Sequence, residues 1–150
     1  MEQAHKFRVV AWWASGRTGI AKSDSAPNAI HFTAPLAFGG VEGRWTPEDL
    51  LLGAVASCFT TTFRAIAEHS AFEYIDLQME VEGTVSRGGT GYGFNEIQIR
   101  AKLTVPREEE EERGLRLLNK TKLACLVSRA LNVQQTFEPV VSVATPALAT

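Results

Sequence analysis

A long apolar stretch from Leu50 to Phe63 constrains the fold of this chain more than any other segment. Thr46, shortly before it, is typical of a helix N-cap, Pro47 suits the first helical position, and the acidic residues 48–49 favour the positive end of a helix dipole. The apolar residues continue around almost every side of the predicted helix, a pattern typical of a helix buried all round. Polar residues return at Arg64, where we expect the helix to leave the core.

Strand-like segments lie on both sides of this helix in the sequence. Apolar alternation and β-branched residues predict strands at 7–14, 20–22, 29–33, 75–85, 94–105 and 136–143, and further helices at 107–119 and 123–131. The alternation changes parity near Asn95, and the glycine-rich stretch 87–93 predicts a flexible hairpin loop. We therefore expect an α+β fold in which an antiparallel sheet carries its helices on one side. A buried helix of about 20 residues, roughly 30 Å long, is more than one small sheet covers, which hints at a partner subunit.

Length and charge narrow the class of protein. The 150 residues fit a single domain, 1–150, and the formal charge of −2 provides no basic face for nucleic acid. We expect no secretory leader at the N-terminus. The longest strongly apolar run, Leu50 to Phe59, is shorter than the roughly 20 residues that span a bilayer. The sequence thus predicts a cytoplasmic protein without a membrane or nucleic-acid partner.

The chain has two cysteines, Cys58 and Cys125, 67 positions apart. In the reducing cytoplasm a cysteine pair is more often catalytic, redox-active or metal-binding than a structural disulfide. Two cysteines and three scattered histidines do not make a standard zinc site, so we expect no metal and no cofactor. The plainest interpretation of each cysteine is a small buried apolar residue, and Cys58 needs a nearby cation or helix N-terminus to become reactive.

Several charged residues are candidates for activating a thiol. Arg17, in the turn Gly16–Gly19, and Arg44 are the upstream cations, and a guanidinium at either position is able to hold a thiolate and a peroxide oxygen. Glu48 is placed to orient such an arginine by a bidentate pair, or simply to complement the helix dipole. Three further cations surround Cys125 in the sequence. They are Lys120, Lys122 and Arg129.

Two motifs then resemble the superfamily of osmotically inducible protein C (OsmC) and organic hydroperoxide resistance (Ohr) proteins. The first is the segment 46–59, with Pro-Glu, a leucine run, small residues and Cys58-Phe59. The second is Cys125-Leu-Val-Ser-Arg-Ala-Leu, in the same order as in the family. The turn around Arg17 also resembles the one that bears the family's active-site arginine. The resemblance covers positions 10–143.

The resemblance implies an intertwined α+β homodimer with central helices between sheets and active sites at the subunit interface. It implies an antioxidant stress protein, a thiol peroxidase that reduces organic hydroperoxides to alcohols with electrons from a dithiol such as a lipoylated protein. Matched to this sequence, Cys58 is the peroxidatic cysteine and Cys125 the resolving one, Arg17 activates the thiolate and binds the peroxide, and Glu48 positions Arg17. Apolar walls from Leu51, Val55, Phe59 and Trp45 are expected to favour bulky organic peroxides.

The sequence departs from the family pattern at Leu126, where the family often has proline after the second cysteine. Glu48 and Cys58 are also ten positions apart, about 15 Å along one helix. Either Arg17 reaches between them, or the helix starts later, or the contact crosses a dimer. Two alternatives to the peroxidase stay open on the same fold, a non-catalytic protein that binds a small hydrophobic molecule and a redox sensor whose disulfide alters partner binding.

Overall fold

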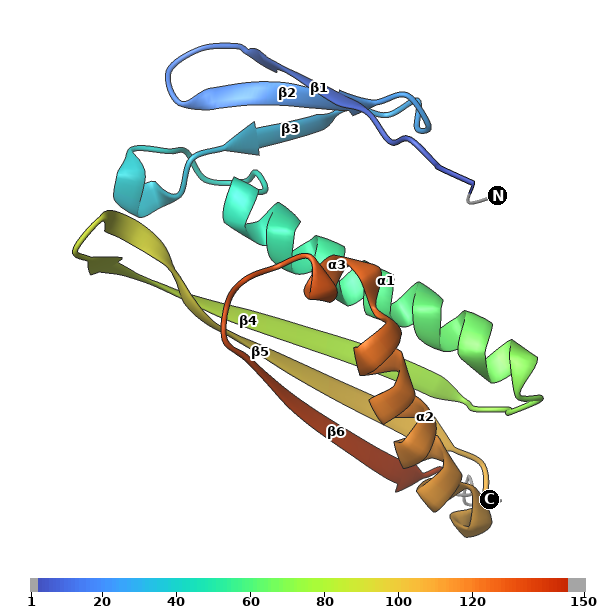
Figure 1. Cartoon of the computed structure of the whole chain (residues 1–150). Coiled ribbons are helices and arrows are strands. Elements are labelled where there is room, and N and C mark those ends of the chain that lie inside the picture. Colours follow the sequence, from blue (N-terminus) through green and yellow to red (C-terminus); the bar gives the residue numbers. More distant parts are fainter. Residues whose placement is uncertain (1–2, 146–150) are drawn as a thin grey trace, which may run out of the picture. The chain divides into compact units, whose positions relative to one another are not determined.

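The computed structural model describes residues 3–145 and folds as two compact units (Figure 1). The first unit ends at Leu51 and the second begins at Leu52. Each unit has its own three-stranded sheet. The long helix α1, Pro47–His69, starts in the first unit and continues into the second.

The first unit is an antiparallel meander. Its strands are β1 (Val9–Trp13), β2 (Thr18–Ser23) and β3 (Ile30–Thr33), in the order β1-β2-β3, followed by the short 3-10 helix η1 (Leu36–Phe38). The three strands predicted from the sequence are therefore confirmed. Gly16, with φ of 52°, occupies the turn between β1 and β2, where a left-handed backbone suits glycine.

Helix α1 begins as its sequence predicts. The Thr46 hydroxyl accepts a hydrogen bond from the Asp49 backbone N–H at 3.0 Å, and Asp49 Oδ2 accepts one from the Thr46 N–H at 3.0 Å. This reciprocal pair is a capping box that satisfies two backbone donors at the helix start. Because Pro47 follows at the first helical position, the option of a later helix start is excluded.

The sheet of the second unit mixes two strand directions. Strand β4 (Asp76–Gly88) pairs antiparallel with β5 (Gly91–Val105), and β5 pairs parallel with β6 (Gln135–Val143). The sheet is thus antiparallel except for its last pair, since the helices between β5 and β6 carry the chain back to the same end. A register shift between Thr84 and Val85 leaves Asn95 unpaired, which confirms the predicted parity change. The hairpin is tighter than predicted, because its strands extend to Gly88 and Gly91.

One face of this sheet forms the core. Every inward residue of β5 from Ile97 to Val105 is fully buried. Helices α1 and α2 (Glu111–Ala124, after the 3-10 turn Glu108–Glu110) cover this face (Figure 1). The buried residues of α1 recur every fourth position, which places them on one side of the helix. They are Val55, Phe59, Phe63 and Ala67.

The expectation that α1 is buried on almost every side is wrong for the single chain. Ser57, Thr60, Thr61 and Arg64 are exposed, so only the side toward β5 is covered. A helix that packs on one face of a single sheet buries only the side that contacts the sheet. The other side of the helix is not covered by that sheet. Helix α1 has 23 residues and contains an 18-residue window with a mean hydropathy of 1.5, so by length and composition it could span a membrane, a test that core helices of soluble proteins pass as well.

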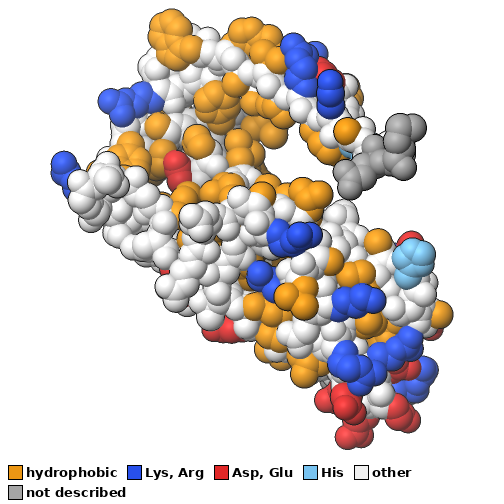
Figure 2. Space-filling view, in the orientation of Figure 1, with side chains coloured by type: hydrophobic (Ala, Val, Ile, Leu, Met, Phe, Trp, Pro, Cys, Tyr) orange, Lys and Arg blue, Asp and Glu red, His pale blue; other side chains and the backbone are white. Residues whose placement is uncertain are grey.

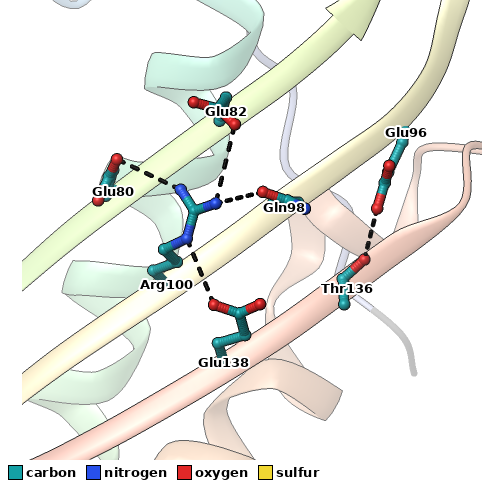
Figure 3. A network of polar contacts seen from close by, with 7 residues as sticks. All are labelled: Glu80, Glu82, Glu96, Gln98, Arg100, Thr136 and Glu138. Carbon is teal, nitrogen blue, oxygen red and sulfur yellow. Dashed lines mark hydrogen bonds and ion pairs between the residues drawn. The ribbon is translucent and has the colours of Figure 1, made fainter.

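The opposite face of the sheet carries charge. Arg100 of β5 forms ion pairs with Glu80 of β4 and Glu138 of β6, each at 3.3 Å, and with Glu82 at 3.7 Å, and it donates to Gln98 (Figure 3). One guanidinium thus links all three strands. Such partly exposed pairs are worth about 0.2–1 kcal/mol each, so the apolar face dominates the stability of the sheet.

Candidate active site

Cys58 lies in the middle of α1 at the edge of the core. Its side chain is half-buried and packs against the cluster that contains Phe59 and Phe63. The Cys58 sulfur and the Thr62 hydroxyl, one turn further along the same helix, are 3.9 Å apart. Because residues four apart share a helix face, this contact follows from the regular helix geometry.

Cys125 lies at a break between two helices. Its backbone angles, φ −64° and ψ 108°, are extended, so α2 ends at Ala124 and the four-residue α3 (Leu126–Arg129) begins after it. The prediction that a helix around 123–131 carries Cys125 is therefore wrong in this detail. The Cys125 carbonyl accepts from the Arg129 N–H at 3.1 Å and from the Ser128 hydroxyl at 3.3 Å, and the side chain is fully buried. The break turns the thiol into the core.

The two thiols are free and meet in this core. Burial by itself raises the pKa of Cys58, but hydrogen bonds to its sulfur outweigh burial and the pKa is lowered. The donors, in decreasing order, are the Val127 backbone N–H, the Cys125 thiol, the Thr62 hydroxyl and the Leu126 backbone N–H. A lowered pKa increases the thiolate fraction at neutral pH, and the thiolate is the nucleophilic form of cysteine.

Arg17 and Glu48 both belong to the first unit, and among the described residues no hydrogen bond or ion pair joins them. Arg17 is exposed, and its Nη1 donates to the Phe38 carbonyl at 2.6 Å. Gly39, with φ of 86°, gives it room, since a Cβ there would lie 3.3 Å from the Arg17 Cδ. Glu48 Oε2 is buried without a hydrogen-bond partner among residues 3–145. The roles assigned to Arg17 and Glu48 stay predictions, and so does the choice between Arg17 and the exposed Arg44.

Two of the four residues that the sequence analysis expected to wall a peroxide pocket lie in the core instead. Val55 and Phe59, expected to wall a peroxide pocket, are instead fully buried against the sheet of the second unit. Trp45 is more than half exposed. Lys120 and Arg129, the cations near Cys125, are exposed, and Figure 2 shows basic and hydrophobic side chains together over α2 and α3.

Sequence reasoning did not identify three groups that contact the Cys58 sulfur. Thr62 was detectable, because it lies four residues after Cys58 in a predicted helix. The backbone N–H groups of Leu126 and Val127 carried no sequence signal, since every residue except proline has one. In the part of the chain that the structure describes, no group of three or more His, Cys, Asp or Glu side chains is arranged to hold a metal ion.

Comparisons with known proteins place the chain in a family. The family described as OsmC-like protein matches residues 40–139, which include Glu48, Cys58 and Cys125 but not Arg17. The uncharacterized protein YmaD of Bacillus subtilis (strain 168) is 28% identical over 130 residues, 85% of this chain and 87% of that protein.

Solved structures agree with this match at the level of the fold. An OsmC-like protein of unknown function from Vibrio cholerae has a TM-score of 0.79 at 13% identity and covers 91% of this chain and 100% of its own. The organic hydroperoxide resistance protein OsmC of Legionella pneumophila has a TM-score of 0.74 at 20% identity, covering 94% and 99%. OhrB of Bacillus subtilis has a TM-score of 0.67 at 21% identity, covering 91% and 98%. The match over residues 40–139 shows that the chain belongs to the OsmC-like protein family.

Proposed function

We propose that this protein is a thiol peroxidase that reduces organic hydroperoxides to alcohols, with Cys58 as the peroxidatic and Cys125 as the resolving cysteine. The observation that supports it best is the contact between two free thiols, one of which has a lowered pKa. A buried structural cysteine has no need of four hydrogen-bond donors to its sulfur. A peroxidatic cysteine does, because it reacts as the thiolate.

The proposed chemistry balances over two steps. The Cys58 thiolate attacks the distal oxygen of the hydroperoxide, the O–O bond breaks, and the alkoxide takes a proton and leaves as the alcohol. Cys58 is thereby oxidised to a sulfenic acid. The Cys125 sulfur then attacks the Cys58 sulfur, the S–O bond breaks, and water leaves as the disulfide forms. A dithiol, for which a lipoylated protein is our candidate, returns both cysteines to thiols by exchange.

Arg17 and Glu48 complete the proposed site. A guanidinium near the reacting sulfur would bind the peroxide and stabilise the charge that develops on the leaving oxygen. Arg17 uses one of its five N–H groups on the Phe38 carbonyl and keeps others for this task. The unpartnered buried oxygen of Glu48 needs a donor, which supports its proposed pairing with an arginine.

We also propose that the protein acts as a homodimer in the cytoplasm. Support comes from α1, whose apolar sequence is covered on only one side in the single chain. A second copy would bury the remaining side at lower cost than exposure to water. The family resemblance points to the same arrangement.

The test is a thiol count with one equivalent of cumene hydroperoxide added to the reduced protein. We expect both thiols to disappear together and the mass to fall by two hydrogens. Cys58→Ser should leave Cys125 unreacted, whereas Cys125→Ser should accumulate a sulfenic acid at Cys58 that dimedone traps. Two thiols that survive the peroxide for minutes would reject the peroxidase and favour the protein that binds a small hydrophobic molecule.

Preference for organic peroxides is a finer part of the proposal. Relatives of this fold that are named for organic hydroperoxide resistance support it, whereas the apolar cluster beside Cys58 is buried in the core and does not bear on this preference. We expect faster oxidation of Cys58 by cumene hydroperoxide than by hydrogen peroxide at equal concentration. Equal rates with the two peroxides would contradict this preference and leave the thiol chemistry intact.

A further inference from the structure

Three threonines follow Cys58 on α1, at positions 60–62, and their hydroxyl groups have different hydrogen-bond partners. The Thr60 hydroxyl donates to the Ala56 carbonyl at 2.8 Å, and the Thr61 hydroxyl donates to the Ser57 carbonyl at 3.1 Å. Both follow the usual habit of threonine in a helix, which is to bond the carbonyl three or four residues earlier. The Thr62 hydroxyl is the exception, because the one partner it has among the described residues is the Cys58 sulfur.

The direction of this bond follows from the chemistry of sulfur. A thiol is able to donate or accept, but a thiolate has no hydrogen and is only an acceptor. Once Cys58 loses its proton, Thr62 must therefore be the donor in this contact. The two groups share a helix face at a spacing of four residues, and the adjacent core residue Phe59 is fully buried, so the helix turn holds them together.

We propose that Thr62 is a thiolate-stabilising residue of the Cys58 site, whose hydroxyl donates to the Cys58 sulfur instead of to the helix backbone. The catalytic value of this bond rests on the proposed peroxidase function. The contact between Thr62 and the Cys58 sulfur does not, because it is present without any peroxide. Removing the hydroxyl leaves the Cys58 thiolate with one donor fewer, which makes the charged form less favourable. The Val127 N–H and the Cys125 thiol still donate, so the loss is partial.

The experiment compares Thr62→Val with two matched variants of the same helix turn, Thr60→Val and Thr61→Val. Valine keeps the branched shape of threonine and removes the hydroxyl in each case. Alkylation of Cys58 by iodoacetamide is followed over a range of pH, with peptide mass spectrometry to separate it from Cys125. The net value of one hydrogen bond, 0.5–1.5 kcal/mol, predicts that Thr62→Val slows Cys58 alkylation about two- to tenfold below its midpoint pH.

The midpoint of the pH profile should also move to higher pH in Thr62→Val. Thr62→Ser, which restores a hydroxyl, should return the profile toward the parent. Thr60→Val and Thr61→Val should keep the parent profile, and thermal unfolding of each variant checks that the fold is retained. A Thr62→Val profile equal to the parent, or a shift that Thr62→Ser fails to restore, would overturn the proposal.

The two proposals fail in different ways in this design. Alkylation that responds to Thr62→Val in a protein that does not consume peroxide would reject the peroxidase and support the role of Thr62. Peroxide reduction with an alkylation profile insensitive to Thr62→Val would do the reverse. A slower peroxide reaction in Thr62→Val that matches its slower alkylation would support both.

Discussion

Cys58 lies inside a continuous helix, whereas Cys125 lies where the backbone leaves the helical conformation between α2 and α3. The helix keeps Cys58 at the edge of the core, half-exposed and one turn from a hydroxyl donor. The break at Cys125 buries its side chain fully and directs the N–H groups of the next two residues toward the other sulfur. One region thus leaves its thiol partly accessible, and the other buries its thiol while its N–H groups donate to the first sulfur.

The largest effect we expect comes from breaking the core that both regions share. Phe59 is fully buried, and its ring centroid lies 5.5 Å from that of Phe137. Phe59→Ala should lower the free energy of unfolding by about 3–5 kcal/mol, because it leaves a cavity beside both thiols. Chemical denaturation measures this loss. As a control, Leu123→Ala removes a side chain that is 78% exposed and should change stability by less than about 0.5 kcal/mol. Similar values for the two variants would contradict the shared core.

Replacing Arg17 tests whether the oxidation rate of Cys58 depends on a residue of the first unit. If Arg17 binds the peroxide, Arg17→Ala should slow oxidation of Cys58 by cumene hydroperoxide about 10²–10³-fold, as for loss of one preorganised donor. Arg44→Ala is the matched control, because Arg44 is the other upstream arginine and is also exposed. Stopped-flow measurement of single-turnover oxidation checks both. A large loss in Arg44→Ala alone would assign the role to Arg44 instead.

The different exposure of the two thiols predicts the order in which they are alkylated. At neutral pH iodoacetamide should modify Cys58 at least about tenfold faster than Cys125, because Cys58 is accessible and its pKa is lowered, while Cys125 reacts only when the core opens. Because the pKa of Cys58 is lowered, its thiolate form persists to lower pH than that of an ordinary cysteine. The alkylation rate of Cys58 should therefore fall only as the pH drops through this lowered pKa. Peptide mass spectrometry resolves the two rates. Equal rates would show that the α2–α3 junction does not protect Cys125.

The smallest effect that we expect comes from removing a backbone N–H at the junction between α2 and α3. Leu126→Pro removes the Leu126 N–H, and proline suits this position, since it begins α3 and follows a residue with extended backbone angles. We expect the pKa of Cys58 to rise and its alkylation at low pH to slow about two- to fivefold, while the Val127 N–H remains. Leu126→Ala keeps the N–H and should match the parent. An unchanged profile in Leu126→Pro would remove Leu126 from the set of donors.

Much of the fold was predictable from local patterns. The Thr46 cap, the strands and the parity change at Asn95 depend on neighbours in the sequence and are confirmed. The helix predicted across Cys125 is wrong at its centre, because tertiary packing of Cys125 into the core overrides the helical preference of its neighbours. The parallel pairing of β6 with β5 has no local signal either, since it depends on how α2 returns the chain.

The sequence by itself determined most of the helices and strands, the two cysteines as the candidate chemistry, and the position of Thr62 on the same helix face as Cys58. Each of these follows from residue type and from the period of a helix or strand. Only the tertiary structure decided that Cys125, 67 positions later, meets Cys58, and that the amides of Leu126 and Val127 donate to its sulfur. Contacts between distant segments depend on how buried faces pack, and a backbone N–H carries no mark of its partner in the sequence.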